Sequence, residues 1–366
     1  MIWIKSILGI FGRTILVWLA IDFFIGNYII NFFGLVPNPG AGVKHDVYHH
    51  DLKPSYDDIV GWGEYKYALC TNQFGFRDTC DKDSQLKSKE IDVAFLGDSF
   101  TQGVGLDWDK TYVGLSSASL KKLNVANLGV SSYAPSIYYS KLKYLLDKGF
   151  KIKSLFVAID ISDIADEARS YLLLDDGSVI EREQMKRKFH ILKQFNKWAF
   201  PFSYRLNRIR LDIKQQSLDK VKTIKEVHVK DNPLYAWTYQ DYPAEFFYGF
   251  VNSREALNIS KSHMTKLAAL AKANNIQLHV VVYPWPAQVF YDTEDSVQAK
   301  VWKDFCESNC SEFINTFPDF FASADEIGKE FFVEKIYIPR DVHFNEEGNK
   351  FLFEVLKRKS KLFKSN

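Results

Sequence analysis

Short apolar segments alternate with amphipathic ones along most of this 366-residue chain. The apolar segments have the length of buried strands, and the longer segments between them repeat their apolar residues with helical spacing. The strands are expected at 91–96, 124–128, 154–159 and 277–283, and the helices at 112–122, 136–146 and 253–275. This alternation predicts an α/β protein with three layers, α/β/α, and a mostly parallel central sheet.

The first of these strands ends abruptly at Gly97-Asp98-Ser99, and Thr101 then suits the beginning of a helix. Ser99 is therefore expected at the carboxyl end of a strand, where open α/β sheets bind their ligands. The N–H groups of the following helix would favour a negative charge developing beside it. A plain helix cap formed by Asp98 and Ser99 explains the same residues equally well.

A second candidate segment lies near the C-terminus, where Asp341 precedes His343 by two residues ahead of a helical pattern at 346–359. A carboxylate so placed can hold one nitrogen of an imidazole while the other nitrogen takes a proton from a serine hydroxyl. These residues are therefore candidates to act together with Ser99.

The Gly-Asp-Ser segment followed by Asp341-Val342-His343 resembles the SGNH (GDSL-like) hydrolase superfamily, over about residues 70–359. The resemblance implies an SGNH/flavodoxin-like fold, with Ser99 as nucleophile, His343 as base and Asp341 as the residue that orients the base. It also implies an oxyanion hole formed by the N–H groups of Ser99 and Gly129. An ordinary turn glycine is the alternative interpretation of Gly129.

The third block of the superfamily, Gly-x-Asn-Asp, is altered here to Asp160-Ile161-Ser162-Asp163. Ser162 stands where an asparagine normally donates to the oxyanion, and a hydroxyl reaches less far. An ionised Asp160 or Asp163 would oppose a negative charge nearby. We therefore expect an oxyanion hole in which Ser162 is at best a weak donor.

The N-terminal segment from Thr14 to Pro37 is apolar apart from Asp22, two asparagines and a few small residues, and Lys5 and Arg13 lie on its N-terminal side. About 20 apolar residues span a bilayer, so residues 1–37 predict one transmembrane helix with a short cytoplasmic stub. A cleaved signal peptide is the alternative, although no clear cleavage site follows. Asp22 would mark a helix partner or be tolerated near the flank.

The four cysteines fall in two close pairs, Cys70 with Cys80 and Cys306 with Cys310. Both spacings allow a disulfide in the oxidising compartment that an exported domain would meet. Zinc binding is the weaker alternative, because neither pair has the usual two-residue spacing.

Residues 38–64 are polar and punctuated by proline and glycine, and are expected to be a linker ahead of the main domain at 65–366. A metal site formed by the histidines and acids near the start of this linker is the weaker interpretation of these residues. An insertion without superfamily blocks is expected at about 167–250. The residues concerned are His45, Asp46, His49, His50 and Asp51 in the linker, and the aromatic residues Trp237, Tyr239, Tyr242, Phe246, Phe247 and Tyr248 in the insertion.

The insertion's aromatic residues suit either stacking on sugars or its own core, and its basic runs suit solvated helix faces or anionic lipid and glycan. Two further residues are candidates for the substrate pocket. Trp285 follows the strand expected at 277–283, in a Pro-Trp-Pro loop, and either walls the pocket or plugs the top of the sheet. Arg77, in Asn-Gln-Phe-Gly-Phe-Arg, either braces the active-site face or pairs with a surface carboxylate.

The charge balance of 47 basic and 45 acidic residues argues against a nucleic-acid surface, and 46% hydrophobic residues suffice for a large core. The resemblance to the SGNH superfamily implies a serine esterase without metal or cofactor. With the predicted membrane anchor, we expect it to remove acyl, in particular acetyl, groups from a cell-envelope polysaccharide or other surface glycan. The predicted location is the bacterial inner membrane, single-pass, with the catalytic domain periplasmic or extracellular and envelope-biosynthesis partners possible. The alternatives are an O-acyltransferase and a catalytically weak glycan-binding or assembly protein.

Overall fold

The computed structural model describes residues 2–29, 40–182, 224–239, 246–249 and 251–365, together with a few positions between 198 and 210. The chain divides into two compact units. One unit comprises residues 1–40 and 183–222, and the other comprises residues 41–182 and 223–366. The two units are described separately below.

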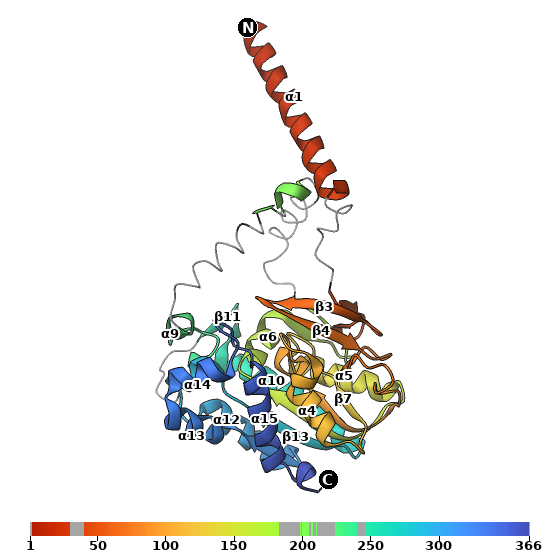
Figure 1. Cartoon of the computed structure of the whole chain (residues 1–366), viewed down its shortest axis with the longest axis vertical. Coiled ribbons are helices and arrows are strands. Elements are labelled where there is room, and N and C mark those ends of the chain that lie inside the picture. Colours follow the sequence, from red (N-terminus) through yellow and green to blue (C-terminus); the bar gives the residue numbers. More distant parts are fainter. Residues whose placement is uncertain are drawn as a thin grey trace. The chain divides into compact units, whose positions relative to one another are not determined.

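The larger unit is built on an eight-stranded sheet with the order β14-β13-β8-β6-β7-β5-β4-β3 (Figure 1). The five strands from β14 to β7 are parallel, and β5, β4 and β3 continue the sheet antiparallel. The strands are β3 (Asp57–Trp62), β4 (Tyr65–Thr71), β5 (Arg77–Asp78), β6 (Glu90–Leu96), β7 (Val125–Asn127), β8 (Lys151–Ile159), β13 (Gln277–Val282) and β14 (Glu312–Asn315).

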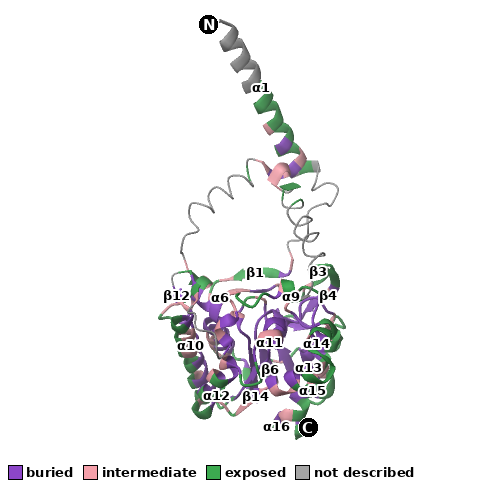
Figure 2. Ribbon diagram, turned by 90° about the vertical axis from the view of Figure 1, so that its left-hand side faces the viewer, coloured by how far each residue is buried: buried purple, intermediate pink, exposed green. Residues whose placement is uncertain are grey.

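Helices cover both faces of this sheet, because alternate residues of each buried strand face opposite layers. In β6, Ala94 and Leu96 pack in one core with α5, α10 and α12, while Val93 and Phe95 pack in the other with α4, α13, α14 and α15. Figure 2 shows the buried residues gathered between these layers. The helices are α4 (Tyr112–Ser119), α5 (Pro135–Asp147), α10 (Ser253–Ala273), α12 (Val297–Asn309), α13 (Phe317–Ile327), α14 (Lys329–Ile336) and α15 (Glu346–Lys359). The predicted three-layer α/β/α arrangement is confirmed.

Shorter elements complete this unit. The hairpins are β1 (Gly42–His45) with β2 (His49–Leu52), β9 (Tyr171–Leu173) with β10 (Val179–Glu181), and β11 (Phe247–Tyr248) with β12 (Val251–Asn252). The remaining helices are α3 (Ser99–Gln102), η2 (Trp108–Lys110), α6 (Ser162–Ser170), α9 (Ile224–Val227), η3 (Ala236–Thr238), α11 (Pro286–Tyr291) and α16 (Lys361–Lys364).

The prediction of a linker at 38–64 is wrong for the part that the structure describes. Residues 42–52 form the hairpin of β1 and β2, and β3 pairs with the whole length of β4 as the edge of the main sheet. An edge strand with one solvated face needs few apolar residues, and β3 is mostly exposed, so its sequence lacks the usual apolar signal. Pro54 and Gly63 lie in the turns between these strands, whereas Gly42 and Gly61 lie within β1 and β3.

The insertion expected at 167–250 is described only in part. Of its aromatic residues, Tyr239 and Tyr248 are buried, and Trp237 and Phe246 are partly buried against hydrophobic clusters. Among those described, Phe247 is well exposed, as is Trp198 earlier in the insertion, and Tyr242 and the basic run 186–188 lie outside the described residues. The described rings therefore serve mainly as core.

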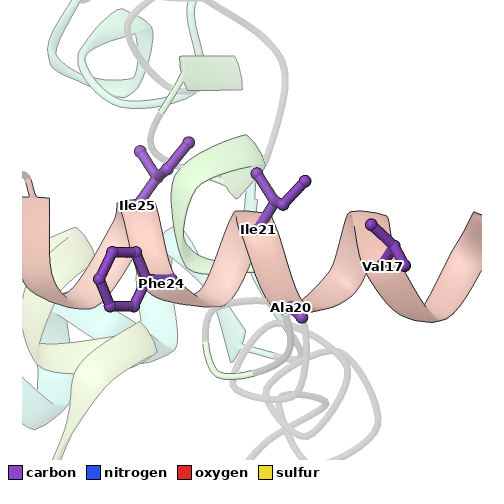
Figure 3. A pocket seen from close by; sticks show the side chains of 5 residues that line it. All are labelled: Val17, Ala20, Ile21, Phe24 and Ile25. Atoms are coloured by element: carbon purple, nitrogen blue, oxygen red, sulfur yellow. The ribbon is translucent and has the colours of Figure 1, made fainter.

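The smaller unit contains α1 (Ile2–Phe24), followed by η1 (Ile25–Ile29). Val17, Ala20, Ile21, Phe24 and Ile25 line an apolar pocket on this segment (Figure 3). In the part of the chain that is described, no helix is both long enough and apolar enough to cross a membrane. Residues 30–37 of the expected span lie outside that part.

Asp22 is buried in the smaller unit and has a partner within it. Its carboxylate accepts from the N–H groups of Phe202 and Ser203, at 3.1 and 3.0 Å, and from the Ser203 hydroxyl. These N–H groups lie at the beginning of a helical stretch, where donors lack intrahelical acceptors. Asp22 therefore contacts a second helical segment.

Both expected disulfides are present. Cys70 is bonded to Cys80, and Cys306 is bonded to Cys310. The first disulfide joins β4 to the loop that precedes β6, and the second closes the end of α12. With their sulfurs bonded to each other, these cysteines are not free to bind zinc as thiolates.

Candidate active site

Ser99 is the first residue of α3, directly after the sharp turn at the end of β6. The Asp98 side chain accepts from the Phe100 N–H at 3.0 Å and caps this helix, so the capping role belongs to Asp98. Gly97 permits the turn, since a Cβ there would lie 2.1 Å from the Thr101 hydroxyl. The turn presents the Ser99 side chain at the carboxyl edge of the parallel strands.

The structure brings Ser99, His343 and Asp341 together in one hydrogen-bonded chain. The Ser99 Oγ lies 2.7 Å from Nε2 of His343, and Nδ1 of His343 lies 2.5 Å from Oδ1 of Asp341. Ser99 and His343 are 8% and 7% exposed. In this arrangement an imidazole can take the hydroxyl proton of a serine while a carboxylate holds its other nitrogen.

Trp62, at the end of β3, contributes to this site and was not singled out from the sequence. Its indole N–H donates to Oδ2 of Asp341 at 2.9 Å, and its ring meets the His343 ring edge-on at 4.9 Å between centroids. Trp62 thereby occupies the second oxygen of Asp341. The contact joins residues 279 positions apart, so no local motif could have signalled it.

The pKa of Asp341 is lowered although the carboxylate is largely buried. Burial alone would raise this pKa, but the hydrogen bond and charge of His343, the His343 N–H and the Trp62 indole together lower it below the usual range. Asp341 is therefore ionised at neutral pH, which is the form that holds an imidazolium in place.

His228 is a second residue that the sequence did not indicate. It is buried, and burial lowers its pKa to about 4, although Asp341 acts electrostatically to raise it. Its Nε2 has no hydrogen-bond partner within the described residues. His228 is therefore a neutral imidazole with an unused nitrogen inside the molecule.

Gly129 lies on the loop after β7, close to α3. A Cβ at Gly129 would lie 2.6 Å from Thr101, so only glycine permits this approach. Its N–H donates to Oδ1 of Asn127 at 2.9 Å, and Asn127 in turn donates to the Thr101 carbonyl at 2.7 Å. The Ser99 N–H, at the first position of α3, is one of the donors that a helix leaves without an internal acceptor.

The Ser162 hydroxyl is engaged with its own neighbour. The N–H and hydroxyl of Ser162 both donate to Oδ1 of Asp160, each at 2.7 Å, and the Trp285 indole N–H donates to Oδ2 of Asp160 at 3.0 Å. The Asp160 carboxylate is therefore held by donors from both Ser162 and Trp285. Ser162 supports this carboxylate and has no hydroxyl proton to spare for a substrate.

We expect Ser162→Ala to change turnover of a chromogenic acetyl ester by no more than about threefold, because the Ser162 N–H still donates to Asp160. Loss of one hydrogen bond to a buried carboxylate should lower the free energy of unfolding by about 2 kcal/mol. Steady-state kinetics and thermal unfolding measure the two effects. A loss of about 10²–10³, typical of a missing oxyanion donor, would contradict the assignment of the hydroxyl to Asp160.

Asp98, Asp160 and Asp163 form a buried acidic cluster beside Ser99. Burial first, and then the charge of Asp160, raises the pKa of Asp98 well above its usual range, and the two carboxyl groups are hydrogen-bonded to each other. We therefore assign the proton to Asp98, which keeps it and donates a hydrogen bond through it to the Asp160 carboxylate. Asp98 then carries no charge against Ser99, whose Oγ lies 3.3 Å from its Oδ2.

Asp163 uses both carboxyl oxygens inside the fold. It accepts from the Tyr138 hydroxyl at 2.5 Å and from the Asp160 N–H at 2.8 Å. Burial and the neighbouring acids raise its pKa well above the usual range. A neutral Asp163 does not oppose an oxyanion, so the expected repulsion from this residue is absent in this form.

We expect Asp98→Asn to stabilise the protein at neutral and alkaline pH. A carboxyl whose folded-state pKa is raised contributes its stability in full below its unfolded pKa and loses it as pH rises through the folded pKa. An asparagine, which does not titrate, can still donate to Asp160 and accept from Phe100. The melting temperature of the variant should therefore exceed that of the wild type by a margin that grows as the pH rises from the usual range of an aspartate pKa into the neutral and alkaline range, and turnover should be retained. A constant difference across this range would contradict a protonated Asp98.

Arg77 and Trp285 are both buried, at 1% and 6% exposure. The Arg77 guanidinium donates to the carbonyls of Gln102, Gly103 and Leu106, and so fixes the loop that follows α3. The prediction that Arg77 lines the substrate pocket is therefore wrong, because an enclosed guanidinium has no surface for a ligand. Trp285 packs against Phe100 and bonds Asp160, as expected of a residue that plugs the top of the sheet.

No family model and no curated protein matches the sequence. Solved structures similar to this chain include an alpha/beta hydrolase from the metagenome of Lake Arreo, with 11% identity and a TM-score of 0.39 over 73% of this chain and 94% of that one. Another is an Axe2 mutant, an acetyl-xylooligosaccharide esterase from Geobacillus, with 14% identity and a TM-score of 0.38 over 73% and 93%. A lipolytic G-D-S-L family protein from Veillonella parvula has 11% identity and a TM-score of 0.38 over 73% and 97%. Likenesses at this level carry no argument, so the functional assignment depends on the geometry of the site.

Proposed function

We propose that this protein is a serine ester hydrolase of the SGNH type. The observation that carries the proposal is the hydrogen-bonded chain from Ser99 through His343 to Asp341, closed by the Trp62 indole. The base contacts both the nucleophile and the orienting acid, and the acid is held ionised.

In the proposed reaction, Ser99 Oγ attacks the ester carbonyl carbon while its proton passes to Nε2 of His343. The carbonyl oxygen becomes an oxyanion, which the Ser99 N–H and the Gly129 N–H bind, the latter by sharing or exchanging its bond to Asn127. Breakage of the ester C–O bond releases the alcohol, which takes the proton from His343. Water then attacks the acyl-enzyme through the same base, releasing the acid and restoring Ser99.

The proposed substrate is an acetylated cell-envelope polysaccharide or other surface glycan. The two disulfides support an oxidising compartment outside the cytoplasm. Exposed apolar side chains on α1, among them Leu16, Val17 and Phe24, support attachment to a membrane. We propose a single-pass anchor in the bacterial inner membrane, with the N-terminus cytoplasmic and partners drawn from envelope biosynthesis.

Transfer of the acyl group to a glycan hydroxyl is the second candidate function. It uses the same residues and differs only in what resolves the acyl-enzyme. A catalytically weak glycan-binding protein on this fold is the alternative from another class.

The test uses the full-length protein in detergent, with p-nitrophenyl acetate and a panel of acetylated and deacetylated glycans. The proposal is supported if the wild type cleaves the ester and Ser99→Ala does not. Formation of acetylated glycan in place of free acetate identifies a transferase. Binding of glycan without cleavage, together with no labelling of Ser99 by a fluorophosphonate, would contradict both enzymatic functions. It would instead support a glycan-binding protein.

A further inference from the structure

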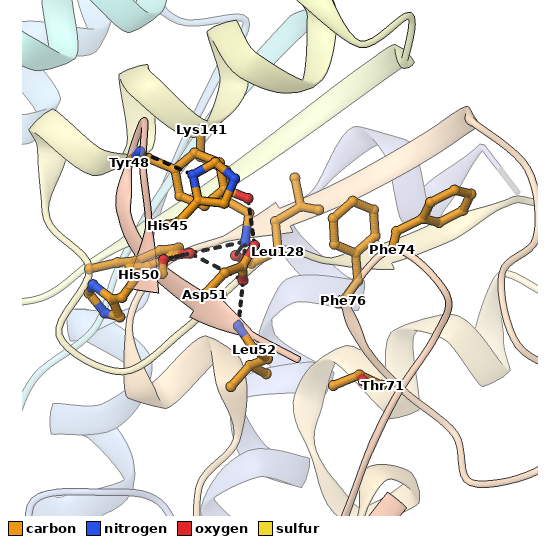
Figure 4. A network of polar contacts seen from close by, with 12 residues as sticks. His45, Tyr48, His50, Asp51, Leu52, Thr71, Phe74, Phe76, Leu128 and Lys141 are labelled. Carbon is orange, nitrogen blue, oxygen red and sulfur yellow. Dashed lines mark hydrogen bonds and ion pairs between the residues drawn. The ribbon is translucent and has the colours of Figure 1, made fainter. Parts of the chain in front are cut away.

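A buried ion pair lies behind the proposed oxyanion loop, between Lys141 of α5 and Asp51 of β2 (Figure 4). The Lys141 Nζ and the Asp51 Oδ1 are 3.0 Å apart, and the two side chains are 1% and 6% exposed. Burying two charges is unfavourable unless their remaining hydrogen-bonding groups are satisfied. The other groups that Lys141 contacts are therefore important, because they must satisfy its buried charge.

The ammonium of Lys141 has an acceptor for each of its three protons. Besides Asp51, it donates to the Leu128 carbonyl and to the Tyr133 hydroxyl, each at 3.1 Å. The cation also lies over the rings of Tyr133, Tyr48 and Phe76, at 4.9, 5.4 and 5.7 Å from their centroids. These contacts fix the position of Nζ relative to Leu128.

The Leu128 carbonyl and the Gly129 N–H belong to one peptide group, and none of the described peptide bonds is cis. In a trans peptide the C=O and N–H point in opposite directions. A cation on the carbonyl therefore lies behind the N–H. Hydrogen bonds in such a chain polarise one another, so the ammonium makes this N–H a stronger donor.

The hairpin of β1 and β2 holds the same loop at further points. His50 bonds the Ser131 carbonyl through Nε2 at 2.9 Å, and the Tyr133 hydroxyl donates to the His50 carbonyl at 2.8 Å. Gln102, of α3, accepts from the N–H and hydroxyl of Ser131 at 2.7 and 2.9 Å. With His50 and Asp51 used in this way, the histidines and acids of 45–51 do not converge on a metal site among the described residues.

We infer that Lys141, paired with Asp51, is a positioning residue for catalysis: it holds the Leu128–Gly129 peptide and polarises the N–H that binds the oxyanion. The inference depends on the proposed esterase function and adds to it a residue that touches neither substrate nor the reacting atoms. Its effect falls on the transition state, where the carbonyl oxygen becomes charged, and not on binding of the neutral ester.

The test compares two variants with a control on the same helix. Lys141→Met combined with Asp51→Asn removes both charges and leaves neither unpaired. Lys143→Met, two residues along α5, removes the exposed ion pair with Asp147 and serves as the control. The measurements are kcat and KM for p-nitrophenyl acetate, the affinity of an arylboronic acid that forms a tetrahedral adduct with Ser99, and the melting temperature.

The double variant is expected to lose about tenfold in kcat with KM unchanged, less than the loss of a whole oxyanion donor. Its affinity for the boronic acid should fall by the same factor, and Lys143→Met should match the wild type. An unchanged kcat, or a loss divided equally between kcat and KM, overturns the inference. A wild type that neither cleaves the ester nor binds the boronic acid, and equals Ser99→Ala, overturns the proposed function as well.

If the double variant does not fold, Asp51→Asn alone tests the role of Lys141. Burial lowers the pKa of Lys141, and Asp51 opposes this shift. Without Asp51 the ammonium should lose its proton at lower pH, so the alkaline limb of kcat/KM should move to lower pH than in the wild type. An unmoved limb overturns the inference. The other titratable groups near this cation are Tyr48, Tyr133, His45 and His50.

Discussion

Replacing Ser99 by alanine is expected to lower turnover of an acetyl ester by a factor on the order of 10⁶, because no other group can form the acyl-enzyme. The double variant Ser99→Ala/His343→Ala should be no slower than Ser99→Ala alone. The base has nothing to act on once the nucleophile is gone, so the two losses do not add. Steady-state kinetics on purified full-length protein measure both.

The matched control for this experiment is Ser119→Ala, at an exposed serine near the end of α4, which should keep full activity. Labelling by a fluorophosphonate gives a second measurement that does not depend on the choice of ester. It should attach one phosphonyl group to the wild type and none to Ser99→Ala. Labelling of both proteins to the same extent would place the nucleophile elsewhere.

Replacing Asp341 by asparagine is expected to lower kcat by about 10⁴ with little change in KM. The amide keeps the size of the carboxylate but no longer favours the imidazole with its proton on Nδ1, so Nε2 is less able to accept from Ser99. It also removes the negative charge that would stabilise the protonated imidazole in the transition state. Endpoint assays with concentrated enzyme and long incubation times measure the residual rate.

Asp325→Asn, at an exposed position of α13, is the control for the loss of a carboxylate elsewhere. Trp62→Phe gives a graded comparison, since it removes the indole N–H from Asp341 and keeps a ring against His343. Its loss in kcat should be clearly smaller than that of Asp341→Asn. A Trp62→Phe variant as inactive as Asp341→Asn would show that the indole does more than support the carboxylate.

The central layers of the fold could be predicted from the sequence because buried parallel strands are nearly continuous in apolar residues, as at 91–96 and 277–282. The edge could not. In β3 only one face touches the protein, so Asp57 and Asp58 stand in a strand that reads as a polar loop. The consequence was not only a missing strand but a missing site residue, since β3 delivers Trp62.

The candidate site was predictable where its residues lie on short motifs, as with Gly97 to Ser99 and Asp341 to His343. The partners of those motifs depend on distant chain segments. The hydroxyl of Ser162 was expected near the oxyanion, yet Asp160, only two residues away, accepts it because Trp285 holds that carboxylate in place. Local spacing gives the groups that are available, and tertiary contacts decide which of them are already used.

The contact of Trp62 with Asp341 also bears on when the protein can become active as it is made. Ser99 meets a histidine 244 positions later, and Asp341 meets a tryptophan 279 positions earlier. Contacts of such long sequence separation form late, since the entropy of closing the loops is lost before the contacts are gained. A chain still on the ribosome and shorter than 341 residues contains the complete nucleophile turn but neither the base nor its acid. The proposed chemistry therefore cannot begin until His343 has been made and the two ends of the catalytic unit have met.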